Sequence, residues 1–167
     1  MNTTLRSTLL VLATAVVLPA QAAIQNWNFS GTLESGAYAG AVFSGNARFD
    51  DAVLTGIGEE WIALDAINLT LLGQSYSTIE AAAVPEAAFV DGAFVGLGYV
   101  VEAGDPKFAL IAGFASLADA YFAYDTSTGL SGTGSLSFAP AVPEPEGWAL
   151  MLAGLIGVAG AARRVRR

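Results

Sequence analysis

The chain of 167 residues contains no cysteine and no histidine. Without cysteine there can be no disulfide bond and no thiol chemistry, so the folded part must be held together by packing. Without histidine, catalytic triads that use imidazole and the usual zinc and copper sites are excluded. The side chains left for chemistry are carboxylates, hydroxyls, a few tyrosines and a single lysine, Lys107.

Positive charge is almost missing from the middle of the chain. Residues 24–140 carry 13 Asp or Glu against only Arg48 and Lys107, which gives a net charge near −11. Such a charge repels phosphate backbones and anionic lipids, so we expect no nucleic-acid partner. The length of this region suits one domain with its own core and is too short for two.

The first 22 residues have the pattern of a secretory signal peptide. Arg6 supplies the positive end, residues 9–18 are apolar, and Ala20-Gln21-Ala22 forms a small-residue cleavage site. Ten apolar residues are too few to span a membrane, which argues against the alternative of an uncleaved anchor. We therefore predict that signal peptidase cuts after Ala22 and that the domain begins at residue 23.

The C-terminal segment, residues 141–167, has three parts in a fixed order. Pro143-Glu144-Pro145 comes first, 16 uncharged residues follow at positions 147–162, and the chain ends with Arg163, Arg164, Arg166 and Arg167. A helix over 147–162 would be about 24 Å long, a thin span for a bilayer core of about 30 Å. The arginines should keep their end cytoplasmic and leave the acidic segment outside. These features predict a temporary membrane tether.

This order of parts resembles the PEP-CTERM sorting domain of bacterial surface proteins. The resemblance implies that an exosortase recognises Pro143, Glu144 and Pro145, and that the four arginines act as the stop-transfer cluster. It also implies a protein that is held briefly in the inner membrane, reaches the cell surface or extracellular space, and is associated with exopolysaccharide and biofilm. The alternative is an ordinary anchor in which Pro-Glu-Pro is a stiff acidic linker.

Residues 23–140 are predicted to form an all-β, antiparallel sandwich or barrel-like ectodomain. Apolar and polar residues alternate in segments separated by Gly, Asp, Ser and Pro turns. The predicted strands are 26–33, 39–49, 61–72, 76–79, 94–101, 107–112, 120–124 and 130–138, with hairpins joining the first two and the next two. The alanine-rich segment 79–88 leaves open a helical turn that Pro85 would stop.

Three kinds of ligand site can be considered in the ectodomain. Asp50, Asp51, Glu59 and Glu60 could offer oxygen ligands to calcium, although acidic pairs at strand exits are usually solvated. Two acids at a suitable spacing could also serve a glycan hydrolase. Six aromatic residues could stack on sugar rings or fill the core instead: Trp27, Trp61, Tyr76, Tyr99, Tyr121 and Tyr124.

The expectation from the sequence is a non-catalytic surface or matrix protein that needs no cofactor, with calcium as the one candidate ion. A carbohydrate-binding module carrying the same sorting signals is the first alternative. A carboxylate-based glycan hydrolase is the second.

Overall fold

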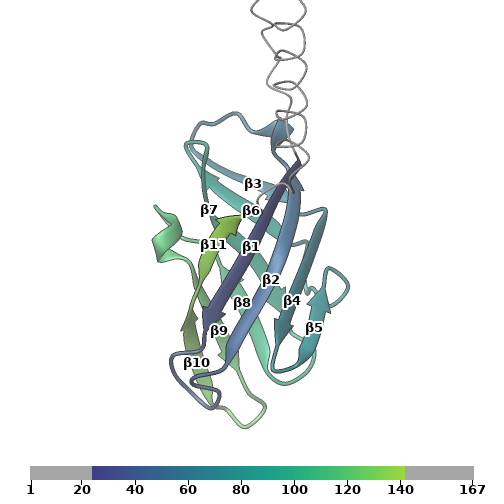
Figure 1. Cartoon of the computed structure of the whole chain (residues 1–167), viewed down its shortest axis with the longest axis vertical. Coiled ribbons are helices and arrows are strands. Elements are labelled where there is room, and N and C mark those ends of the chain that lie inside the picture. The colour runs from purple at the N-terminus through teal and green to yellow at the C-terminus, as the bar shows by residue number, and fades with distance from the viewer. Residues whose placement is uncertain (1–23, 142–167) are drawn as a thin grey trace, which may run out of the picture.

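A computed structural model of the chain describes residues 24–141 as two antiparallel sheets that face each other (Figure 1). The first sheet has the order β11 (Ser137–Pro140), β1 (Ile24–Thr32), β2 (Val42–Asp50), β4 (Ala66–Leu71) and β5 (Gln74–Ser77). The second has the order β10 (Ser131–Ser135), β9 (Tyr121–Asp125), β8 (Lys107–Ile111), β7 (Ala93–Val101), β6 (Glu86–Val90) and β3 (Glu59–Ala63). Two single-turn 3-10 helices, η1 (Asp51–Val53) and η2 (Leu117–Asp119), lie in the connections. The all-β prediction is confirmed, and the two separate sheets make the fold a sandwich.

The core lies between the sheets and contains the residues that the alternation places on one face of each strand. Phe29 and Phe43 are buried on β1 and β2, as are Ile67, Leu69 and Leu71 on β4. Each is followed or preceded by exposed polar residues, so one face of the strand meets the other sheet and one face meets water.

Aromatic rings form much of this core. Phe94 on β7 lies in the middle of one group, with its ring centroid 4.5 Å from that of Trp27 and 5.3 Å from that of Phe138. A second group joins the sheets where Phe43 packs on Phe122 at 4.5 Å. Burying such large rings supplies packing energy of the kind that small secreted domains often obtain from disulfides.

Several core aromatic rings cover a glycine on the neighbouring strand. Phe29 pairs with Gly45, Phe43 pairs with Gly31, and Tyr124 pairs with Gly132. A Cβ atom added to any of these glycines would collide with the ring of its partner. At these three positions, glycine therefore leaves room for an aromatic ring to pack against the backbone of the neighbouring strand.

Both predicted hairpins are present, as β1–β2 and β4–β5. The single strand predicted over 61–72, however, is two strands in different sheets. The chain leaves the six-stranded sheet at Leu64, whose N–H donates to Pro85 O, and joins the five-stranded sheet at Asp65, whose N–H donates to Arg48 O. Two residues thus carry the chain across the core.

The strand predicted over 130–138 is divided in the same way. β10 pairs with β9 in the six-stranded sheet, whereas β11 pairs with β1 in the five-stranded sheet. Leu136 lies between them and is buried, so the alternation of small and polar residues continues across the junction without a break. The sequence pattern therefore gives no sign of the change of sheet.

The alanine-rich segment 79–88 does not contain the helical turn that the sequence left open. Residues 79–85 form turns and bends, and the segment then continues into β6, a strand that was not predicted. Ala87 and Ala88 are buried in the sheet. Alanine has a low preference for strands, so burial between neighbouring strands rather than local propensity determines this element.

The two ends of the described region lie side by side at one end of the sandwich (Figure 1). Trp27 pairs with Pro140, and the N–H of Ala141 donates to Asn26 O at 2.8 Å. The predicted signal peptide (1–22), sorting motif (143–145), membrane helix (147–162) and arginine cluster (163–167) lie outside the described residues. Among residues 24–141, no helix is long and apolar enough to cross a membrane.

Candidate functional site

The two aspartates proposed for calcium make local contacts at the end of β2. Asp50 Oδ1 accepts a hydrogen bond from Ala52 N at 3.0 Å and so caps helix η1. Asp51 Oδ2 accepts from the side-chain amide of Gln25 at 2.8 Å. Both carboxylates therefore hold the turn that follows the strand.

The two glutamates of the same hypothesis stabilise different groups. Glu60 accepts hydrogen bonds from Thr55 N at 2.7 Å, Thr55 Oγ1 at 2.9 Å and Gly56 N at 2.8 Å. These bonds, above all the one from the Thr55 backbone, lower the pKa of Glu60 because they favour its charged form. Glu59 instead accepts from the indole nitrogen of Trp61 at 2.8 Å.

The four acids do not come together as one set of ligands. Consecutive residues on a strand point to opposite faces, which separates Glu59 from Glu60. Within the part of the chain that the structure describes, no three acidic side chains are grouped in a way that could hold a metal ion. Three of these acids stabilise the segments next to β2 and β3, whereas Glu59 binds the indole of Trp61.

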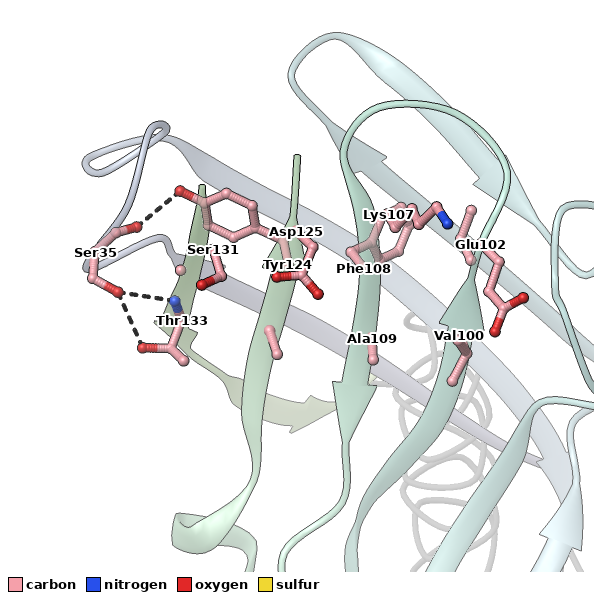
Figure 2. A pocket seen from close by; sticks show the side chains of 13 residues that line it. Ser35, Val100, Glu102, Lys107, Phe108, Ala109, Tyr124, Asp125, Ser131 and Thr133 are labelled. Carbon is pink, nitrogen blue, oxygen red and sulfur yellow. Dashed lines mark hydrogen bonds between the residues drawn. The ribbon is translucent and has the colours of Figure 1, made fainter. Parts of the chain in front are cut away.

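A shallow hollow of about 620 Å³ lies on the outer face of the six-stranded sheet, over β7 to β10 (Figure 2). Ala109 and Ala123 are directly paired on β8 and β9 within its lining. Lys107 pairs with Asp125 across the same two strands and brings a cation and a carboxylate to the hollow. The small side chains of the alanines leave room above the sheet.

One wall of the hollow is fixed by hydrogen bonds around Ser35 (Figure 2). The hydroxyl of Tyr124 donates to Ser35 O at 2.9 Å and accepts from Tyr38 N at 2.8 Å. Ser35 Oγ accepts from Thr133 N at 2.9 Å. This network ties the β1–β2 loop to β9 and β10, so the polar groups of the wall have a structural role. The hollow offers a hydrogen-bonding surface.

A second, smaller depression lies near the β3 edge of the same sheet. It has a volume of about 150 Å³, and we call it the aromatic slot; its lining is Glu59, Trp61, Ala88, Val90, Val95, Ala112, Gly113 and Phe114. Trp61 is 47% exposed and Phe114 is 91% exposed. The slot is apolar except for Glu59, so it suits a ligand that has a flat apolar face and a polar edge.

The structure divides the six aromatic residues that the sequence proposed for sugar stacking. Tyr99 and Tyr124 are buried in the core, and Trp27 and Tyr76 pack against it. Trp61 and Tyr121 are exposed. The rings of the first four residues are thus used for packing, and only the last two can meet a large ligand.

Phe114 was missed by the sequence analysis. It lies in the segment Gly113-Phe114-Ala115-Ser116, which shows no alternation and falls outside every predicted strand. The one available signal was a large aromatic residue between small residues in a loop. A large aromatic residue in a loop can be buried or exposed, and the positions of the neighbouring strands are needed to decide between the two.

The chain matches no protein-family model, no curated protein and no solved structure.

Proposed function

We propose that this protein is an exported, non-catalytic protein of the cell surface or extracellular matrix that an exosortase processes. The observation that carries the proposal is the order of Pro143-Glu144-Pro145, the apolar segment 147–162 and the terminal arginine cluster. A signal peptide at the opposite end of the sequence supports it, because both signals are needed to reach an exosortase from outside the membrane.

The position of the chain ends is compatible with this route. β1 begins and β11 ends at the same end of the sandwich, so a membrane segment joined to β11 would leave the opposite end facing away from the bilayer. The acidic surface would keep the domain from settling on anionic lipid. A cut close to Pro143 would then release or transfer the domain with both sheets intact.

Replacing Pro143, Glu144 and Pro145 together with alanine tests the sorting motif. Proline fixes its own φ and keeps the preceding residue extended, so the native motif is presented outside the membrane helix. We expect the triple variant to be exported and then to accumulate in the inner membrane, as measured by cell fractionation. Glu102→Ala, which removes an exposed acid from the domain, is the control and should be delivered normally. Unchanged delivery of the triple variant would indicate a plain anchor.

Glycan binding is the second candidate function. It is favoured by the aromatic slot, where two exposed aromatic side chains lie on one face of the domain. Solvent exposure of two large rings at one place suggests contact with a ligand, because most aromatic residues of this domain are used in its core. An array of immobilised polysaccharides would separate a glycan-binding surface protein from one that binds none.

A further inference from the structure

The side chain of Trp61 is held flat against the sheet. Its strand partner on β6 is Ala88, and an added Cβ at Gly98 on β7 would lie only 3.2 Å from the ring atom Cζ3. The indole therefore lies across two strands, over positions that have small or no side chains. The bond from its N–H to Glu59 Oε1 fixes the direction of the ring. Trp61 thus presents its free surface to solvent in one orientation.

Phe114 is held by a loop with its own constraints. The loop is tied to β7 by the bond from Gly113 N to Val95 O at 2.8 Å, and a Cβ at Gly113 would collide with the Ser116 backbone. Asp119 Oδ2 accepts from Ser116 N at 3.0 Å and from Ser116 Oγ at 3.1 Å. These contacts constrain the backbone of the loop, while the side chain of Phe114 remains exposed to solvent. One set of contacts therefore orients the Trp61 ring, and a second, independent set fixes the loop backbone from which Phe114 projects.

We infer that the aromatic slot binds one sugar ring of an extracellular glycan, and this inference rests on the glycan-binding function proposed above. The apolar face of a pyranose stacks on the indole of Trp61, and Phe114 closes the opposite side. Glu59 is exposed and already accepts one bond from the indole, so its carboxylate can also accept a hydrogen bond from a sugar hydroxyl.

The surroundings of the slot favour a sugar over a protein partner. The slot has room for one ring, whereas a stable protein interface buries about 800 Å² on each partner. Such interfaces avoid acidic residues at their centre, but Glu59 lies in the slot. The net charge of the domain, near −11, further favours a neutral or cationic glycan over an anionic one.

Titration calorimetry of the full chain in a detergent without a sugar head group tests this site. The probes are three soluble hexasaccharides, of β-1,4-linked glucose, β-1,4-linked N-acetylglucosamine and α-1,6-linked mannose. We expect at least one to bind, and we expect Trp61→Ala and Phe114→Ala each to weaken its binding by about tenfold or more. Tyr121→Ala, which removes another exposed ring of the same sheet, is the matched control and should bind as the native chain does.

Circular dichroism of each variant shows whether the fold is kept. In a Trp148→Phe background, Trp61 and the half-buried Trp27 are the only indoles, so a bound sugar should also change the tryptophan emission of the chain.

No binding of any of the three probes would overturn the inference. Binding that survives Trp61→Ala would also overturn it, while leaving glycan binding as the function of another surface. Neither result bears on export or processing.

Discussion

Tyr99 illustrates, at the scale of one residue, how this core accommodates a polar group. The side chain is 1% exposed, and its hydroxyl donates a hydrogen bond to Ser77 O at 2.7 Å. Burial disfavours the phenolate and raises the pKa of Tyr99 to about 12. One hydrogen bond therefore satisfies the hydroxyl of a tyrosine buried in this core.

Replacing Tyr99 with phenylalanine should lower the free energy of unfolding by about 1 kcal/mol at pH 7, because Ser77 O loses its donor. The native tyrosine contributes its full stability below its unfolded pKa of about 10. That contribution is lost as the pH rises toward the folded value of about 12, since the unfolded state releases its proton first. Urea unfolding at pH 7 and pH 11 should therefore show a smaller difference between the native chain and the variant at pH 11. The control is Tyr121→Phe, which changes an exposed tyrosine. If the difference in free energy of unfolding between the native chain and Tyr99→Phe were the same at both pH values, the hydroxyl of Tyr99 would not be buried and neutral.

At the scale of the strand, glycines under aromatic rings explain how the two sheets enclose large side chains. A Cβ at Gly45 would collide with the backbone oxygen of Asn68 and with the ring of Phe29. The first of these is backbone and cannot rotate away. β2 and β4 would have to separate locally to admit even a methyl group.

Gly45→Ala should therefore destabilise the domain by about 1–3 kcal/mol, in the range of other overpacked cores. Ser44→Ala, at the neighbouring position on the outer face, should change the stability by less than about 0.5 kcal/mol. Thermal unfolding of the two variants measures the difference. Equal melting temperatures would show that the Phe29 ring and the β2–β4 pairing do not depend on a glycine at this position.

The strands were predictable where alternation and turn residues coincide, as in the β1–β2 and β4–β5 hairpins. The prediction failed where tertiary structure decides. Alternation runs through Leu136 although the chain changes sheet there, and β6 begins with Glu86-Ala87-Ala88, residue types that have a low preference for strands. For the candidate site, the sequence identifies Trp61 as one of six aromatic residues that could meet a ligand. That its ring lies over Gly98 follows only from the pairing of the strands in the structure.

At the scale of the whole molecule, the two faces of the sandwich differ in chemistry. The outer face of the five-stranded sheet carries neutral amides and hydroxyls, with Asn28, Asn46 and Asn68 in one row across the strands. The six-stranded sheet carries the polar hollow and the aromatic slot. The ligand surface that we propose lies on the outer face of the six-stranded sheet. The start of β1 and the end of β11, which we propose to face the membrane, lie at one end of the sandwich.

The most direct test of the proposed export and processing is the intact mass of the protein recovered outside cells of the organism that produces it. We expect a mature chain that begins near Ala23 and ends near Pro143, because in our proposal signal peptidase removes the first segment and an exosortase removes the apolar segment with its arginines. A modified C-terminus would appear as added mass on that chain. Recovery of most molecules with residues 148–167 still attached would show that no exosortase processes the protein.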